Sequence, residues 1–280
     1  MFLATLPKQM AIPFSSLLVK LIRRRAWQPF HERLLRFSKV GMNYWGGAMV
    51  AQSGERMALR FIAERSREVE DLVVFDVGAN FGNYTSAVLE AMPSGTVVHA
   101  FEPSQAAMDK FREAIAGHPQ GRYVQAHTLG LSNSKGNATL YAPFIGSGIG
   151  TLHPAPFDVL GSTNSTEAIE LTTIDAFCSE NGIERIDLLK IDAEGHELAV
   201  LQGARGMIDA GRVRFIQFEF GECHLDSRVF LRDFHVLLSP RYRIHRILPD
   251  GLWPLNSYSP DQEIFNTANY LAFAPTEKPL

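Results

Sequence analysis

The sequence predicts an α/β fold: a doubly wound, mostly parallel sheet with an antiparallel edge, preceded by an N-terminal helical arm. Two observations carry this prediction. From residue 72 onwards, short apolar segments rich in β-branched residues alternate with amphipathic helical patterns, as in parallel sheets covered by helices. The last two apolar segments, 242–248 and 269–274, have no helical pattern between them, so we expect them to pair antiparallel at one edge.

The N-terminal segment differs from the rest of the chain in its charge. Residues 1–40 carry eight Lys or Arg side chains against Glu32 alone, although the whole 280-residue chain has a formal net charge of −3. Such an uneven distribution indicates a segment with a task of its own. We therefore expect two parts: a basic helical arm with a glycine-rich linker over residues 1–54, and a main domain over residues 55–280.

The expected elements follow one another without an internal repeat. Helical patterns cover residues 14–39 (with an interruption at Pro29), 55–69, 83–92, 104–117, 174–181, 195–204 and 227–238. Strands are expected at 72–77, 96–102, 123–131, 137–142, 186–192 and 213–220, ahead of the two closing strands. The segment 143–168 is rich in glycine, proline and serine, and we expect a long loop there, of a length that is usually functional.

The cysteines and the N-terminal apolar run bear on the location of the protein. Cys178 and Cys223 have neither a metal-ligand spacing nor a disulfide framework, so we expect two reduced thiols in a cytoplasmic protein. The apolar run at 11–22 is interrupted by Pro13 and Lys20, is too short to span a bilayer and lacks a signal-peptide cleavage site. The basic arm leaves two uses open: peripheral contact with the inner membrane surface, or packing against the domain or a second subunit of a homodimer.

A glycine loop follows the first strand of the main domain. The stretch VVFDVGANFGNYT (73–85) places Asp76, Gly78 and Gly82 at a strand end, where ligands bind in such sheets. A dinucleotide fingerprint reads G-x-G-x-x-G, whereas this loop reads D-x-G-x-x-x-G, and Asp76 would repel a diphosphate. The carboxylate suits S-adenosylmethionine, which has a sulfonium and an amino group but no phosphate. Asp76 would bind that amino group or brace the loop, and backbone N–H groups around Asn80 would bind the methionine carboxylate.

A second acid stands at the end of the next predicted strand. Glu102 follows VVHAF and lies 20 residues beyond Gly82. A carboxylate in this position accepts hydrogen bonds from the ribose hydroxyls of a nucleoside cofactor. Taken alone, Asp76 is equally explained as a turn residue and Glu102 as a solvated strand end. Together, on consecutive strands, they favour a nucleoside-type cofactor and leave an NAD-dependent oxidoreductase as the weaker alternative.

Six segments resemble the FkbM-type methyltransferases, in the order FDVGANFGNYT, FEPS, LGLSNSKGNATL, LTTIDAFC, IDLLKIDAEGHELAVLQGA and FIQFEF. They span about residues 72–220. The resemblance implies a Rossmann-like class I methyltransferase fold, S-adenosylmethionine as the donor, and O-methylation of a sugar or polyketide hydroxyl. Residues 1–50 and most of 221–280 lie outside the resemblance, and we expect them to select the acceptor. The candidate donor-binding residues are Asp76, Gly78, Ala79, Asn80, Gly82, Tyr84, Thr85, Glu102, Ser104, Ser132 and Asp192.

The segment LLKIDAEGHE contains the candidate acceptor site. A sugar hydroxyl is a poor nucleophile at neutral pH, so a general base or a metal ion must assist the loss of its proton. Asp192, at a strand end, is the first candidate, with Lys190, Glu194 and His196 beside it. Glu219, on the neighbouring predicted strand, would join Asp192 in holding Mg²⁺ or another hard cation.

Structural roles compete with these assignments. His196 would also fit as a plain helix-start residue, and Lys190 and Glu219 as members of ion pairs. His153, in the long loop, is an alternative base, and His224, just past a strand end, is a further candidate.

The expected partner is a small-molecule or glycan acceptor. Outside the basic arm the chain is acidic, which disfavours nucleic acid as a substrate. A non-catalytic binding or scaffold module with the same fold is the second alternative. It is disfavoured because Asp76, Glu102 and Asp192 all place acids at strand ends.

Overall fold

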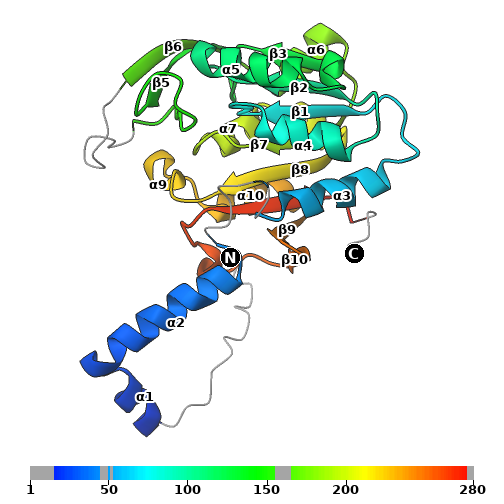
Figure 1. The fold of residues 1–280 in the computed structure, drawn as a ribbon. Coiled ribbons are helices and arrows are strands. Elements are labelled where there is room, and N and C mark those ends of the chain that lie inside the picture. Colours follow the sequence, from blue (N-terminus) through cyan, green and yellow to red (C-terminus); the bar gives the residue numbers. More distant parts are fainter. Residues whose placement is uncertain (1–15, 45–49, 51–52, 155–164, 276–280) are drawn as a thin grey trace, which may run out of the picture. The chain divides into compact units, whose positions relative to one another are not determined.

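The computed structural model describes residues 16–44, 50, 53–154 and 165–275 (Figure 1). The chain forms two compact units, residues up to 42 and residues from 43 onwards. The predicted division at residue 54 stays a prediction. Within the described ranges, no helix is long and apolar enough to cross a membrane.

The first unit contains two helices joined by a short 3₁₀ turn. These are α1 (Ser16–Ile22), η1 (Arg25–Trp27) and α2 (Gln28–Gly41). The expected interruption at Pro29 is wrong, because Pro29 lies in the first turn of α2, where the missing N–H is not needed. The break lies before α2 instead, at the turn that contains η1.

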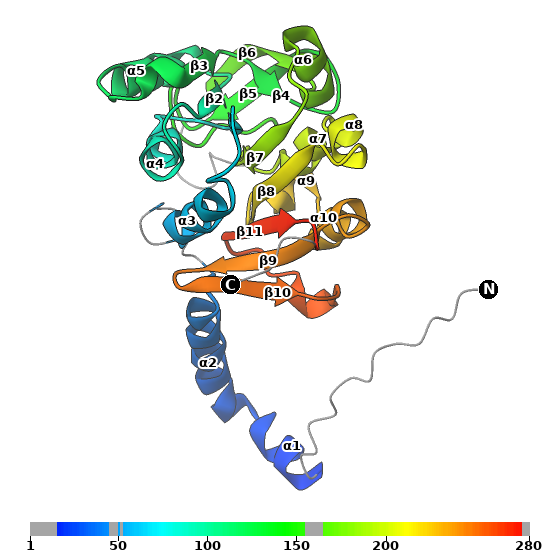
Figure 2. The same cartoon turned by 90° about the vertical axis from the view of Figure 1, so that its right-hand side faces the viewer.

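An eight-stranded sheet forms the centre of the second unit and confirms the predicted fold class (Figure 2). Its strand order is β10-β9-β11-β8-β7-β1-β2-β3. Five neighbouring strands are parallel: β3 (Val124–His127), β2 (Val97–Phe101), β1 (Val73–Val77), β7 (Ile186–Ile191) and β8 (Val213–Phe220). The expected antiparallel edge consists of β11 (Ala268–Phe273), β9 (Arg243–Leu248) and β10 (Gly251–Leu255).

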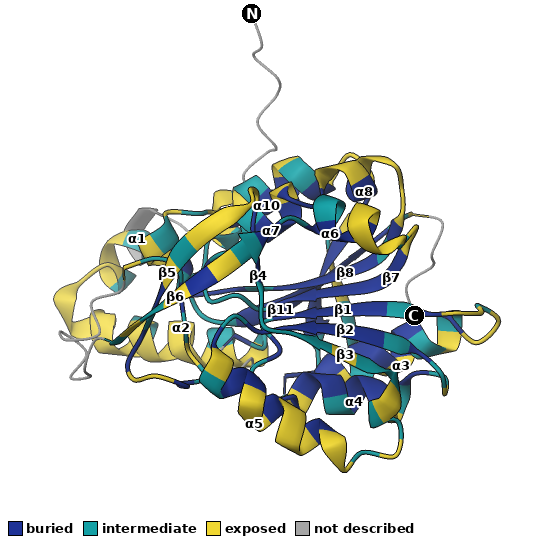
Figure 3. Ribbon diagram, turned by 90° about the horizontal axis from the view of Figure 1, so that it is seen from above, coloured by how far each residue is buried: buried dark blue, intermediate teal, exposed yellow. Residues whose placement is uncertain are grey.

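Helices cover both faces of this sheet (Figure 3). One face carries α3 (Glu55–Arg65), α4 (Asn83–Ala91) and α5 (Gln105–Ala116). The other carries α6 (Ile174–Asn181), α7 (Glu197–Gln202), α8 (Arg205–Asp209) and α10 (Leu231–Leu238). Strands β1 and β7 are buried over almost their whole length, which explains their uninterrupted apolar sequences. The remaining short elements are η2 (Gly121–Tyr123), α9 (His224–Ser227) and η3 (Pro260–Gln262).

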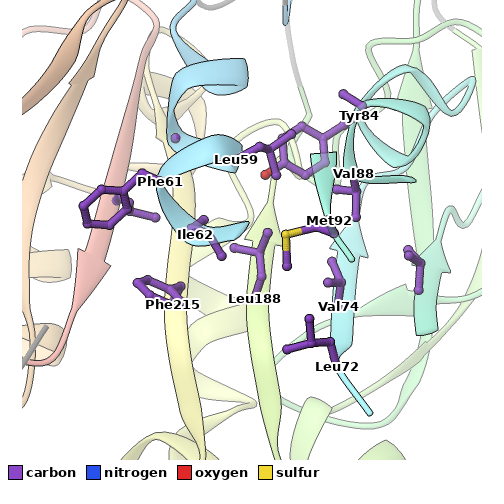
Figure 4. Close-up of a cluster of buried hydrophobic side chains, with 14 of the residues drawn as sticks. Leu59, Phe61, Ile62, Leu72, Val74, Tyr84, Val88, Met92, Leu188 and Phe215 are labelled. Atoms are coloured by element: carbon purple, nitrogen blue, oxygen red, sulfur yellow. The ribbon is translucent and has the colours of Figure 1, made fainter. Parts of the chain in front are cut away.

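The main core lies between the sheet and helices α3 and α4 (Figure 4). Leu59 and Ile62 of α3 and Val88 of α4 pack with Val74 of β1 and Leu188 of β7, and all five are fully buried. Burying side chains of this size stabilises the fold by roughly 1.5–3 kcal/mol each. This core holds α4, and therefore the glycine loop before it, at the carboxyl end of β1.

A second, three-stranded sheet corrects two details of the predicted strands. The order is β4-β6-β5, with β4 (Gly130–Leu131), β5 (Gly136–Ala142) and β6 (Ser165–Thr172). The single strand expected over 123–131 is therefore divided between two sheets. Residues 165–168, expected in the long loop, belong to β6, whose sequence begins with the polar residues STE and therefore lacks a clear strand pattern. Of the expected loop, 155–164 lie outside the described residues.

Candidate active site

The glycine loop joins the ends of three neighbouring strands. The N–H groups of Gly78 and Ala79 both donate to the Phe101 carbonyl at the end of β2, at 2.9 and 3.0 Å. Gly78 has a φ of +78°, and its α-carbon faces the Asp192 carbonyl beyond β7. Gly82, with a φ of +86°, is the N-cap residue of α4. Only glycine adopts these two backbone conformations without strain, so the spacing of the motif follows from the geometry of the turn.

Asp76 braces the loop from within the protein. The residue is fully buried, and the Thr85 hydroxyl of α4 donates a 2.6 Å hydrogen bond to its Oδ2 atom. Burial raises the pKa of the Asp76 carboxyl, and the nearby Lys190 ammonium opposes that rise. The contact ties β1 to the first turn of α4, which favours the bracing role over direct contact with a ligand.

Glu102 connects the glycine loop to α5. Its Oε2 atom accepts a hydrogen bond from the Asn80 N–H at 3.1 Å, and its Oε1 atom accepts one from the Ser104 N–H at 2.9 Å. Burial raises the pKa of Glu102 to about 7, although the two N–H donors counteract the effect. The carboxyl thus changes charge near neutral pH, at the place where the sequence predicted contact with ribose.

Three buried polar atoms around the loop lack a hydrogen-bond partner among the described residues. They are Oδ1 of Asp76, Oδ1 of Asn80 and Oγ of Ser104. Such atoms are rare in folded proteins and call for a partner. The amino group and ribose hydroxyls of S-adenosylmethionine are hydrogen-bond donors, so this donor-poor cradle fits that cofactor.

The start of the long loop lies against both halves of the site. The Asn80 side chain donates to the Gly148 carbonyl at 3.1 Å, and the Thr151 hydroxyl donates to the Glu194 carbonyl at 2.7 Å. Lys110 of α5 also donates to the Gly146 carbonyl at 3.2 Å. The described part of the loop therefore connects the glycine loop with the segment after β7.

The end of β7 and the segment after it present a lysine and two acids, Asp192 and Glu194. Nζ of the buried Lys190 lies 3.0 Å from Oδ2 of Asp192. Burial would lower the pKa of Lys190, but the carboxylates of Asp192, Glu55 and Asp76 raise it, so the ammonium stays charged. Glu194 has a φ of +49°, and its Oε2 atom accepts a 2.9 Å hydrogen bond from the Cys223 thiol. Burial and the nearby Asp192 raise the pKa of Glu194 to about 7.

A chain of three polar side chains lies beside these acids. Oγ of Ser132 lies 2.9 Å from Nε2 of His196, and Nδ1 of His196 lies 3.4 Å from Nε2 of His153. Burial, together with His153, lowers the pKa of His196 to about 4, so the ring is neutral at pH 7. The structure thus brings the two candidate bases, His153 and His196, together. The Ser132 side chain contacts His196, and its predicted role in donor binding stays a prediction.

Two buried networks support the site and were missed in the sequence. Glu197 accepts hydrogen bonds from the Ala193 and Gly195 N–H groups, and its Oε2 lies 3.0 Å from Nε2 of His224. Both side chains are fully buried, so His224 holds the turn and lies away from solvent. The only indication in the sequence that Glu197 holds this turn is its position just after Gly195, in the first turn of α7.

The second network lies beneath Lys190. The Tyr84 hydroxyl donates to Oε1 of Gln217 at 2.8 Å, and Nε2 of Gln217 donates to Oε1 of Glu55 at 2.8 Å. The Lys190 ammonium lies 4.9 Å from the centre of the Tyr84 ring. The Tyr84 hydroxyl, predicted to bind the donor, therefore has a partner inside the protein. No feature of the sequence places Gln217 beside it, because their contact depends on the strand order.

The predicted metal pair is not part of a larger ligand cluster. Within the described ranges, no group of three or more His, Cys, Asp or Glu side chains is arranged to hold a metal ion. Burial, followed by the charges of Asp192 and Glu194, raises the pKa of Glu219 well above its usual range. Metal binding by Asp192 and Glu219 stays a prediction.

Comparison with known proteins identifies the family. Residues 76–239, more than half of the chain, match the model of the methyltransferase FkbM domain. A Beauveria bassiana protein named methyltransferase 1 is 29% identical over 48% of this chain and 59% of its own length. The hexuronic acid methyltransferase AglP of Haloferax volcanii is 27% identical over 60% of this chain and 64% of its own length.

A third relative is matched over more of its length. The 2-O-methyltransferase NoeI of Sinorhizobium fredii is 25% identical over 66% of this chain and 78% of its own length. The first two relatives are thus matched over less than two thirds of their lengths. The matched region begins at Asp76 near the end of β1 and includes the glycine loop, Glu102, the segment after β7 and the parallel strands β2, β3, β7 and β8. The chain therefore belongs to the FkbM-domain methyltransferase family.

Proposed function

We propose that this protein is an S-adenosylmethionine-dependent O-methyltransferase that acts on a hydroxyl of a sugar, a glycan or a related natural product. One observation carries the proposal: a donor-poor cradle around Asn80 and Glu102 lies next to a segment with Asp192 and Glu194. The names of two relatives, a hexuronic acid methyltransferase and a 2-O-methyltransferase, support a glycan acceptor.

The donor site consists of the glycine loop and Glu102. In this proposal the unpartnered Oδ1 atom of Asn80 and the carboxylate of Glu102 accept hydrogen bonds from the amino group and the ribose of the cofactor. Ser104 contributes its buried hydroxyl, and Asp76 holds the loop in place through Thr85. When bound, S-adenosylmethionine supplies an electrophilic methyl group.

The remaining work of the site is to orient the acceptor oxygen and to remove its proton. We assign the role of general base to Oε1 of Glu194, which would accept the proton of the acceptor hydroxyl. The Oε2 atom already accepts a hydrogen bond from the Cys223 thiol. A pKa of about 7 suits a general base at neutral pH. The left-handed backbone of Glu194, fixed by Thr151, is the kind of strain that functional sites retain. Asp192, paired with Lys190, orients the acceptor, and the neutral His196 is the alternative acceptor of the proton.

The basic arm gives this enzyme a second kind of contact. In α2, Phe30, Leu34 and Phe37 recur at helical spacing and are 48–76% exposed, while Arg33, Arg36 and Lys39 line the same helix. Large apolar side chains beside arginines characterise helices that lie on anionic lipid surfaces. We propose that α2 binds an anionic lipid surface, with a second copy of the chain as the competing occupant.

Calorimetry with the product S-adenosylhomocysteine tests the donor site. We expect micromolar binding of this compound and none of NAD⁺, and loss of binding in Glu102→Ala. Binding of NAD⁺ alone would overturn the proposal in favour of an oxidoreductase, and binding of neither would favour a non-catalytic module.

Methyl transfer to glycan acceptors then tests the base. Glu194→Gln should keep its affinity for S-adenosylhomocysteine and lose a factor of about 10²–10⁴ in kcat. Glu113→Gln, at an exposed carboxyl of α5, is the matched control and should leave both quantities unchanged. Full activity of Glu194→Gln would move the role of base to His196.

A further inference from the structure

Asn269 is a buried amide in a strand of otherwise apolar and aromatic residues. The residue is the second of β11 and is only 3% exposed. Both Oδ1 and Nδ2 lack a hydrogen-bond partner among the residues that the structure describes. Leaving a buried polar group unpaired is destabilising, and the other residues of β11 are buried alanines and large apolar or aromatic residues. A leucine would fill such a position at lower cost, so the amide calls for a functional explanation.

The strand register places this amide at the acceptor side of the site. Asn269 lies directly opposite Glu219 in the antiparallel pair of β11 and β8. Residues directly opposite each other project from the same face of a sheet. On the other side of β8, Lys190 lies opposite Gln217, so Asp192, two residues later, is level with Glu219. Asp192, just beyond the end of β7, Glu219 of β8 and Asn269 of β11 therefore form a row, here called the acceptor row.

The acceptor row continues the site of the proposed function. Asp192 is tied to Lys190 at 3.0 Å, and its carbonyl lies against Gly78 of the donor loop. One end of the row thus adjoins the donor site, and Asn269 marks the other end. An amide donates and accepts hydrogen bonds at the same time, which matches a hydroxyl group that does both.

We propose that Asn269 binds a hydroxyl group of a polyhydroxylated acceptor and is a specificity-determining residue of this enzyme. The inference rests on the proposed methyltransferase function and extends it to the class of acceptor. Sites that hydrogen-bond a substrate hydroxyl discriminate strongly against analogues that lack it, because the buried amide is then left unpaired.

The first test is the stability of the ligand-free protein. Asn269→Leu keeps the number and branching of the side-chain heavy atoms and removes the amide, so we expect the thermal midpoint to rise by about 2–4 °C. Gln217→Leu is the matched control, because Gln217 is equally buried on the adjacent strand but is bonded to Tyr84 and Glu55. That variant should lower the midpoint. A lower midpoint in both variants would show that the Asn269 amide has a structural role and would overturn the proposal.

The second test uses methyl glycosides of glucose, mannose, rhamnose and N-acetylglucosamine as acceptor probes. With the best probe, Asn269→Leu should raise KM at least tenfold and leave the affinity for S-adenosylhomocysteine within twofold of wild type. Unchanged KM in Asn269→Leu would overturn the role of Asn269 and leave the proposed function standing. Failure of the wild type to bind S-adenosylhomocysteine would instead count against the proposed function, while the stability comparison would still decide the role of the amide.

Discussion

Gly78 and Asp192 bring the glycine loop and the segment after β7, the proposed donor and acceptor sides, into direct backbone contact. A β-carbon built on Gly78 would lie 1.7 Å from the Asp192 carbonyl oxygen, which is far inside any permitted contact. The Asp192 N–H in turn donates to the Val77 carbonyl at 2.9 Å. The distance between the two proposed half-sites is therefore fixed by main-chain atoms, which change position less readily than side chains do. Methyl transfer depends on such positioning, because the acceptor oxygen must lie in line with the methyl group.

Gly78→Ala should consequently destabilise the protein and abolish donor binding. The new methyl group collides with the Asp192 carbonyl and the backbone at φ +78° is strained, so we expect a loss of more than about 3 kcal/mol in the free energy of unfolding. Gly95→Ala is the control: φ is +93°, but no described atom lies within 4 Å of the added carbon, so only strain of about 1–2 kcal/mol is expected. Equal losses in urea unfolding would show that the contact is unimportant.

Donor affinity should depend on pH through Glu102. Burial raises the pKa of Glu102 to about 7, and only the ionised carboxylate accepts hydrogen bonds from both ribose hydroxyls. Affinity should therefore increase as pH rises through 7, and fall about tenfold between pH 8 and pH 6. Calorimetric titration with S-adenosylhomocysteine measures this directly. Glu102→Gln should bind more weakly at every pH and show a flat profile, and a wild-type profile without slope would contradict the assignment.

A stacked pair of histidines, the buried His99 and the half-buried His127, should make the fold sensitive to acid. Nδ1 of His99 lies 3.1 Å from Nε2 of His127, and the rings stack at 5.3 Å. Burial and His127 lower the pKa of His99 to about 4, and burial lowers that of His127. Between pH 6.5 and pH 4, His99 is protonated in the unfolded chain but neutral in the folded protein. The contribution of His99 to the free energy of unfolding is therefore fully present above pH 6.5 and decreases below it. At pH 5 the loss is on the order of 2 kcal/mol.

Urea unfolding at pH 7.5, 6 and 5 measures this dependence. His99→Phe, which suits the neighbouring rings of Phe75 and Phe177, should reduce the slope of stability against pH by about one proton. Phe75→Leu removes a neighbouring ring without a titratable group and should lower stability equally at each pH. An unchanged slope in His99→Phe would refute the role of this pair, since the other buried histidines then account for the whole effect.

The parallel part of the sheet was predictable because its strands are buried on both faces. VVFDV and IDLLKI present continuous apolar runs, and the helices between them have clear periodicity. Strand β6 was missed because its sequence, STEAIELT, begins with three polar residues in succession and shows no regular alternation of polar and apolar residues. Strand β10 was missed because it contains Pro254, and proline is rare in strands. Edge strands are the exception, and β10 lies at the edge of the sheet.

The proposed donor half of the site was similarly accessible from sequence, because Asp76, Gly78 and Gly82 lie within one short stretch and Glu102 lies at the next strand end. The acceptor half was only partly accessible. Asn269 lies opposite Glu219 because β11 inserts between β8 and β9, although β9 and β10 precede it in the chain. No local pattern reveals that insertion. Contacts between distant segments, such as Cys223 with Glu194, depend in the same way on the tertiary fold.

Vesicle binding tests the proposed contact of α2 with lipids. The full chain should sediment with vesicles that contain phosphatidylglycerol and stay in solution with vesicles of pure phosphatidylcholine, because the arm combines exposed aromatic residues with arginines. Adding salt should weaken binding by screening the charges. Phe30→Ser combined with Phe37→Ser should reduce the bound fraction at least tenfold. Trp253→Ser, which removes an equally exposed aromatic residue of β10, is the control and should bind as wild type.

The competing occupant of α2 predicts a different pattern. If a second copy covers Phe30 and Phe37, the wild type should have the mass of a dimer in light scattering, and the double variant that of a monomer. Vesicle binding would then be absent or indifferent to phosphatidylglycerol. A monomer that binds only anionic vesicles supports the proposed contact with lipids. The apolar side chains of α2 are then exposed to water in solution and become buried at the membrane.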